Sequence, residues 1–244
     1  EIAMVAIEAK NLTKTFGEKT AVKGINLTIE QGELFALLGT NGAGKTTTIQ
    51  MLSTLIQPTS GEISIQGLTL QKEKQKIREI LNVSPQETAI APNLSVKENL
   101  EFMAGVYQIE HPQKKIQELI RVFQLDEVLK QKAKTLSGGW QRRLSISISL
   151  INTPQVLFLD EPTLGLDVIA QKELWRVIGQ LKGNITILLT THYMEEAEHL
   201  SDRIGIMANG NLVAVGTAEE LIQKAHAKNF EDAFVQIATG GELA

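Results

Sequence analysis

The chain of 244 residues has no cysteine, and this single absence excludes several kinds of chemistry. Disulfide frameworks, thiolate metal sites and cysteine nucleophiles all need a thiol. An excess of positive charge is lacking too, because 24 Lys and Arg residues stand against 28 Asp and Glu residues, a formal net charge of −4. Since nucleic-acid binding needs a basic footprint, we expect no nucleic-acid partner.

Long hydrophobic runs are also missing. The longest, such as residues 156–159 and 185–189, have the length of a strand and fall far short of the ~20 residues that cross a bilayer. The first residues include Glu1 and Glu8 and lack the basic segment that begins a signal peptide. Met4 is a candidate native start, and residues 1–3 are given no weight. We therefore expect a cytoplasmic protein that relies on another chain for any membrane span.

Apolar residues make up 43% of the chain, which is enough to build a packed core. The short apolar runs 34–38, 156–159 and 185–189 are typical of parallel strands that are buried on both faces. Residues 21–30 instead alternate apolar and polar side chains, which predicts an antiparallel, half-exposed segment. An Asn-Gly turn at 209–210 predicts a hairpin, and helical spacing without strands from about 92 to 150 predicts a helical insertion.

A glycine-rich loop follows the first buried run. Residues 39–46 read G-T-N-G-A-G-K-T and lead into a helical pattern, the strand–loop–helix context of a phosphate-binding loop. Glycines let successive backbone N–H groups point into one concavity, and the helix start adds partial positive charge. Lys45 can reach terminal phosphates and Thr46 can ligate Mg²⁺. We expect the phosphates to be surrounded by Gly39, Thr40, Asn41, Gly42, Ala43, Gly44, Lys45, Thr46 and Thr47.

Two acidic residues, Asp160 and Glu161, end the buried run 156–159. Because ligands of open α/β sheets bind at the carboxyl ends of strands, Asp160 is expected beside the glycine loop, where a carboxylate can hold Mg²⁺. Glu161 should point to a different face and orient or deprotonate an attacking water. Taken alone, two acids after a strand are more often a feature of a turn or a helix cap. Their combination with the glycine loop favours the functional interpretation.

A third motif, L-S-G-G-W-Q-R-R at 136–143, precedes another helical stretch. Ser-Gly-Gly at a helix start is a second anion cradle. One nucleotide in one subunit needs only one such surface, so the second cradle is expected to serve a nucleotide that is held by another copy.

With these three motifs in this order, the chain resembles the nucleotide-binding subunits of ABC transporters over roughly residues 5–217. L-S-G-G resembles the family's signature sequence. The stretches T-N-G-A-G-K-T-T-T at 40–48, M-E-E-A-E at 194–198 and F-E-D-A-F at 230–234 resemble the drug- and antibiotic-export type. The resemblance implies an ATPase that requires Mg²⁺ and powers transport through separate membrane-spanning subunits.

The resemblance also implies roles for single residues. Phe16 matches the aromatic residue on which adenine stacks, and Val22 matches an aliphatic residue near the base. Gln86 matches the glutamine that touches Mg²⁺ and the attacking water, and His192 matches the histidine that contacts the γ-phosphate. The pair 166–167 matches a loop that crosses a dimer interface.

The chain departs from the family pattern at three positions. Leu164 and Gly165 stand where the family often has Ser and Ala, in the loop that crosses the dimer interface. Trp140 replaces the common Gln after the two glycines, and no role is assigned to it.

The other histidines, His111, His199 and His226, are expected to be surface or structural residues.

The implied fold is α/β: a phosphate-loop sheet core with an N-terminal antiparallel β subdomain and an inserted α-helical subdomain at about 90–150. We expect the ATP-binding domain to occupy residues 1–217 and a short helical extension to occupy 218–244.

The expected mechanism uses a head-to-tail pair of such chains. ATP would be clamped between Lys45 and Thr46 of one copy and Ser137, Gly138 and Gly139 of the other. Lys45 and His192 would stabilise charge on the γ-phosphoryl group, Glu161 would act on the water, and Thr46, Gln86 and Asp160 would hold Mg²⁺.

The membrane partner is expected to place a short helix against residues 87–107, with Ile90, Leu94 and Met103 as candidate contacts. Met103 fits simple packing of the helical subdomain better. The assembled protein would then be peripheral on the cytoplasmic face of the cell membrane.

Two other functions stay open at this point. A soluble ABC ATPase that acts on ribosomes or nucleic acid is one, although such proteins usually carry two motif sets or a long coiled coil. A phosphate-loop kinase or GTPase is the other, and the signature at 136–139 argues against it.

Overall fold

Two β-sheets organise the computed structural model, which describes residues 4–240. The smaller sheet is antiparallel and has the order β2-β1-β4-β5. Its strands are β1 (Val5–Phe16), β2 (Lys19–Glu30), β4 (Ser60–Ile65) and β5 (Leu68–Thr69). The antiparallel segment expected at 21–30 is therefore confirmed as part of β2.

The larger sheet has the order β10-β9-β3-β8-β7-β6. All neighbouring strands of this sheet pair in parallel except β9 and β10, which form the antiparallel hairpin expected around Asn209-Gly210. The bounds are β3 (Leu34–Gly39), β6 (Leu81–Ser84), β7 (Val156–Asp160), β8 (Thr186–Thr191), β9 (Arg203–Ala208) and β10 (Asn211–Gly216). The three apolar runs of the sequence are thus β3, β7 and β8.

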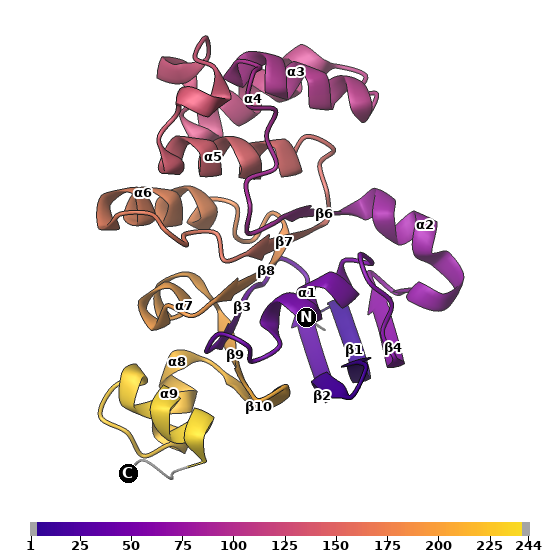
Figure 1. The fold of residues 1–244 in the computed structure, drawn as a ribbon, viewed down its shortest axis with the longest axis vertical. Helices are drawn as coiled ribbons and strands as arrows, with labels where there is room; N and C mark the ends of the chain where they lie inside the picture. Colours follow the sequence, from indigo (N-terminus) through magenta and orange to yellow (C-terminus); the bar gives the residue numbers. More distant parts are fainter. Residues whose placement is uncertain (1–3, 241–244) are drawn as a thin grey trace.

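Helices surround this sheet, with α3, α4 and α5 gathered at one end of the molecule and α8 and α9 at the other (Figure 1). Two short 3₁₀ turns, Asp126–Val128 and Ala133–Thr135, connect α4 to α5. The helices are α1 (Lys45–Leu52), α2 (Leu70–Ile80), α3 (Val96–Val106), α4 (Pro112–Phe123), α5 (Gly138–Ser149), α6 (Val168–Gly179), α7 (Met194–Leu200), α8 (Ala218–Lys224) and α9 (Phe230–Thr239).

The larger sheet separates two hydrophobic cores, because successive side chains of a strand point to opposite faces. In β3, Leu34 and Leu38 belong to the core with helices α3 to α7, whereas Phe35 and Leu37 face the antiparallel sheet and α1. The strand β7 divides in the same way, with Phe158 on the α1 side. Both faces of the sheet are covered, which explains why β3 and β7 read as continuous apolar runs.

The helical insertion is confirmed, since the described residues between 92 and 150 contain helices and one isolated bridge, Ser95 to Lys132, but no strand. A capping box starts α3: Ser95 Oγ accepts from the Glu98 N–H, and the Glu98 carboxylate accepts from the Ser95 N–H. The apolar face of α4 enters the same core as β3, through Ile116 and Phe123. The insertion is therefore packed onto the sheet domain.

The segment after residue 217, for which a helical extension is predicted, contains α8 and α9. Leu221, Phe230 and Phe234 of these helices are buried in the core beside α7 and β9, so the extension shares the core of the sheet domain. Residues 1–3 and 241–244, which end the two expected domains, lie outside the described residues. Within 4–240, no helix is long and apolar enough to cross a membrane.

The packing predicts that replacing two phenylalanines by alanine lowers the free energy of unfolding by very different amounts. Phe158→Ala should lower the free energy of unfolding by about 3–5 kcal/mol, because the side chain is fully buried. Phe102→Ala is the matched control, since Phe102 is 58% exposed on α3, and it should shift the urea midpoint little. Equal midpoints for the two variants would contradict this assignment of the core.

Candidate functional site

A cleft of about 540 Å³ opens where the glycine loop meets the ends of β7 and β8. It brings together residues that are far apart in the chain, from the first strand to residue 192. Most of the sequence-predicted site residues are among those that line it: Phe16, Lys19, Ala21, Asn41, Gly42, Gly44, Lys45, Thr46, Thr47, Gln86, Glu161, Leu164 and His192.

The glycines of the loop are required by close backbone contacts. A Cβ atom on Gly39 would lie 2.5 Å from the carbonyl oxygen of Met207. A Cβ atom on Gly44 would lie 2.7 Å from the Ala21 carbonyl oxygen, and Gly44 also has a φ of +104°, in the region that favours glycine. The loop between β3 and α1 is thus held tightly against β2 and β9.

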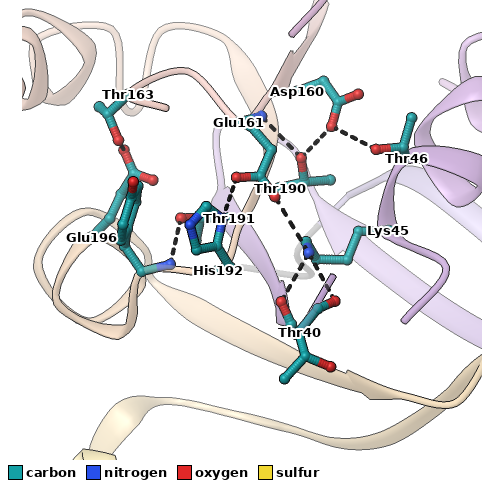
Figure 2. A network of polar contacts seen from close by, with 12 residues as sticks. Thr40, Lys45, Thr46, Asp160, Glu161, Thr163, Thr190, Thr191, His192 and Glu196 are labelled. Carbon is teal, nitrogen blue, oxygen red and sulfur yellow. Dashed lines mark hydrogen bonds and ion pairs between the residues drawn. The ribbon is translucent and has the colours of Figure 1, made fainter. Parts of the chain in front are cut away.

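Lys45 starts α1 and folds back over the loop that precedes it (Figure 2). Its Nζ donates to the carbonyl oxygens of Gly39 at 2.8 Å and Thr40 at 3.2 Å. The same Nζ lies 3.3 Å from Oε1 of Glu161, and only about 5% of the lysine side chain is exposed. A buried ammonium group with three oxygen partners is therefore fixed at the floor of the cleft.

Asp160 points toward α1, on the same face of β7 as Phe158. Its Oδ1 accepts hydrogen bonds from Thr46 Oγ1 at 3.2 Å and from Thr190 Oγ1 at 2.5 Å. Asp160 and Thr190 are paired neighbours on β7 and β8, which explains the second contact. The carboxylate expected to hold a metal is therefore oriented by two hydroxyl groups.

Glu161 follows the strand and turns sharply, with a φ of +48° that is uncommon for a residue other than glycine. Its N–H donates to Thr190 at both the carbonyl oxygen, 3.1 Å, and Oγ1, 3.0 Å. Strand alternation predicts a different direction from Asp160, and the left-handed turn is what achieves it. The Glu161 carboxylate faces Lys45 and His192, and it is buried.

His192 lies just beyond the end of β8. Its Nδ1 is 2.5 Å from Oε2 of Glu161, and its ring is half-buried beside Tyr193. The hydrogen bond from this ring to Glu161 leaves Nε2 as the second nitrogen available to a ligand. Among the other histidines, His199 packs against Trp175, and none lines the cleft.

The oxygen groups at the cleft fit a divalent cation that arrives together with phosphates. Thr46 and Asp160 supply a hydroxyl and a carboxylate, and the Gln86 amide also lines the cleft. No group of three or more His, Cys, Asp or Glu residues within 4–240 is placed to hold a metal ion. Mg²⁺ is often bound through one or two carboxylates plus substrate phosphates, which matches this donor set.

The two residues expected near a base differ in exposure. Phe16 lines the cleft and is 51% exposed, so part of its ring is open to a stacking partner, while Lys14 Nζ lies over the ring at 5.0 Å from its centroid. Val22 is fully buried beneath the loop, and the structure does not place it on the cleft surface. Lys19 and Ala21 form that wall instead.

The signature residues Ser137, Gly138 and Gly139 do not line the cleft of their own chain. Ser137 is the N-cap of α5, and Ser137 and Gly138 are exposed. Their neighbours are residues of the segment after Glu161: a Cβ on Gly138 would lie 3.4 Å from Leu166. Asp167, in the same segment, caps α6 by accepting from two backbone N–H groups.

Glu196 on α7 is a buried carboxyl group that sequence reasoning missed. Its Oε1 accepts from Thr163 Oγ1 at 2.8 Å and from Trp175 Nε1 at 3.0 Å, while Oε2 has no hydrogen-bond partner. Burial raises the pKa of Glu196, and the negative charge of Glu161 adds to the rise. The group ties the turn after Glu161 to the helix after His192.

Thr190 was missed as well, although its hydroxyl contacts both acidic residues. A threonine within a buried strand carries no distinguishing sequence signal, because β-branched residues are common in strands. Lys19, Ala21 and Leu164 were also missed as cleft residues, since none of them belongs to a chemically specific motif.

Together, the fold and the glycine loop define a phosphate-loop nucleotide-binding protein. The sequence profile of the family described as "ABC transporter" matches residues 22–164. Over 238 aligned residues, the chain is 39% identical to the linearmycin resistance ATP-binding protein LnrL of Bacillus subtilis. The alignment covers 96% of this chain and 75% of LnrL. This chain therefore belongs to the ABC transporter family, among its ATP-binding subunits.

Other similar proteins agree with this. The probable multidrug ABC transporter ATP-binding protein YbhF of Escherichia coli is 39% identical over 95% of this chain, which spans 41% of YbhF. A solved ATP-binding subunit of an ABC transporter has a TM-score of 0.83 and 27% identity, covering 95% of this chain and 99% of that one. The ATP-binding cassette MJ0796, in a dimeric post-hydrolysis state bound to ADP and Pi, has a TM-score of 0.76 and 28% identity, covering 86% and 98%.

The raised pKa of Glu196 predicts how stability depends on pH. Folding that raises the pKa of a carboxyl group favours its protonated form. The folded state therefore loses stability as the pH rises from 4.5, the ordinary pKa of glutamate, through the raised pKa. Glu196→Gln keeps an acceptor for Thr163 and Trp175 without the ionisation. Urea unfolding at several pH values should show a smaller loss of stability with rising pH in the variant than in the wild type.

The contrary result would be a stability difference between wild type and Glu196→Gln that stays constant from acidic to alkaline pH. In that case the carboxyl group would not change its charge state on unfolding.

Proposed function

We propose that this chain hydrolyses ATP to power transport, in the direction of export, through separate membrane-spanning subunits. The single observation that carries the proposal is the buried Lys45, placed between the loop carbonyls and Glu161 and beside the Thr46–Asp160 pair. The names of LnrL and of the daunorubicin resistance ATP-binding protein DrrA3 refer to resistance, and that of YbhF refers to multidrug transport. These names support export of such compounds.

Each residue of the site has a role that follows from its charge. Lys45 and the backbone N–H groups of the loop would hold the terminal phosphates of ATP. Thr46, Asp160 and Gln86 would hold Mg²⁺, which supplies charge neutralisation between the phosphates. Glu161 would orient the attacking water and accept its proton, and His192 would contact the γ-phosphate through its free ring nitrogen.

A second copy would complete the site. The N-terminus of α5 is exposed at Ser137 and Gly138, which do not line the cleft of their own chain. A bound triphosphate offers anionic oxygens that a helix N-terminus can bind, so ATP can join two chains head to tail. The dimeric state reported for the MJ0796 cassette supports this arrangement.

The membrane partner would bind the helical insertion, which would place the chain peripherally on the cytoplasmic face of the membrane. Of the three candidate contacts, Ile90 and Met103 pack against the core and Leu94 is half-buried. The large apolar side chains that α3 and the residue after it expose are Phe102, Val106 and Tyr107. These three fit a partner helix better than Met103 does.

Two substitutions should separate binding from hydrolysis. Glu161→Gln removes the negative charge that competes with phosphate for Lys45, so affinity for ATP should be kept or increased. Turnover should fall by about 10²–10⁴-fold if Glu161 acts on the water. Lys45→Met should instead weaken the binding of ATP itself. Calorimetric titration with Mg-ATP and a phosphate-release assay measure the two effects.

The two variants serve as controls for each other, because each removes one partner of the same ion pair. Near-normal turnover in Glu161→Gln, or unchanged ATP affinity in Lys45→Met, would contradict the assigned roles.

A further inference from the structure

The loop that carries Gln86 is held by the side chain of Arg142, from the helix that starts with the signature residues. Arg142 Nη1 donates to the carbonyl oxygen of Pro85 at 2.8 Å, and Nη2 donates to the carbonyl oxygen of Gln86 at 2.5 Å. Only 5% of Arg142 is exposed. The two terminal nitrogens of the guanidinium group therefore bind the carbonyl oxygens of two successive peptides.

A second residue on the same face of α5 holds the flanking positions. The Ser145 and Ser84 hydroxyls are 3.4 Å apart, and Ser145 Oγ accepts from the Ala89 N–H at 3.3 Å. Residues 142 and 145 are one turn apart, so their side chains lie on one face of the helix. Residues 84–89 are thus attached to α5 before, at and after Gln86.

Burying the charge of Arg142 costs free energy, and an ion pair with an acidic side chain does not offset that cost. Within residues 4–240, Arg142 forms no ion pair, and burial lowers its pKa against the attraction of Asp160 and Glu196. A buried charge is often replaceable by an apolar residue without loss of stability. A role in geometry explains its presence better than a role in stability.

We propose that Arg142 is a positioning residue that fixes the backbone of Gln86 in the cleft by holding it against α5. The proposal rests on the proposed function, in which Gln86 touches Mg²⁺ and Ser137 faces the nucleotide of a partner copy. Losing the Arg142 contacts would free the Gln86 backbone and so misplace the Gln86 side chain in the cleft.

The adjacent Arg143 provides a matched control. It is equally buried and on the same helix, but it donates to Glu173 of α6 at 2.7 Å and packs over the Trp140 ring at 4.7 Å. Arg143 therefore holds α5 against α6, and within residues 4–240 it makes no hydrogen bond to the Gln86 loop. Removing it disturbs the same helix without touching the Gln86 loop.

The test is a double-mutant cycle in the full chain, with Arg142→Met, Arg143→Met and Gln86→Ala alone and in pairs. Steady-state hydrolysis is measured as a function of Mg²⁺ and of ATP. Misplacing a catalytic group by about 1 Å costs up to about 100-fold, so Arg142→Met should lower kcat by about 10- to 100-fold. It should also raise the Mg²⁺ concentration for half-maximal rate and leave KM for ATP within about twofold.

The diagnostic result lies in the double variants. If Arg142 acts through Gln86, Arg142→Met should lower kcat by less than about twofold in the Gln86→Ala background. Arg143→Met should have the same fold effect in both backgrounds. Arg142→Lys keeps the charge but cannot offer two parallel donors, so it should lower kcat in the same way. It keeps the test valid if the methionine variant folds poorly.

An equal fold effect of Arg142→Met in both backgrounds, or full activity in Arg142→Lys, would overturn the positioning role while leaving the ATPase intact. A wild-type chain that hydrolyses no Mg-ATP at any concentration would instead overturn the proposed function, and the Arg142 role with it.

Discussion

The site depends on one buried positive charge. Lys45 lies between two backbone carbonyls and the Glu161 carboxylate with little access to water. An ammonium group in such a place is costly unless oxygens surround it, and its partners are drawn from the glycine loop and the end of β7. A phosphate group brought to this position can replace part of that set. Lys45 is thus both the structural link across the cleft and the cation that an anionic ligand meets.

The parallel sheet is what assembles the groups around this charge. The strands β3, β7 and β8 lie side by side, so their carboxyl ends deliver Gly39, Asp160 and Thr191 to one edge. The Thr190 hydroxyl then orients both acids: it donates to Asp160 and accepts from the Glu161 N–H. Two adjacent carboxyl groups thus point in different directions because of a single turn.

Much of this arrangement could be predicted from the sequence, because short local sequence patterns specify it. The glycine loop, the buried runs of β3, β7 and β8, and the acidic pair are contiguous segments whose chemistry is specific. The short strand β6 reads L-N-V-S, too short and mixed for a periodic signal. Arg142 and Glu196 could not be predicted either, because their partners lie 56 or 57 and 21 to 33 residues away. The burial of Val22 depends on packing between the two sheets.

The central claim is that each chain holds half of a site that a nucleotide completes. Static light scattering on Glu161→Gln, with and without saturating Mg-ATP, tests it most directly. The account predicts a mass close to one chain without nucleotide and close to two chains with Mg-ATP, and Ser137→Arg on the exposed start of α5 should abolish the increase. A mass that stays at one chain with Mg-ATP, at high protein concentration and with membrane partner present or absent, would contradict it.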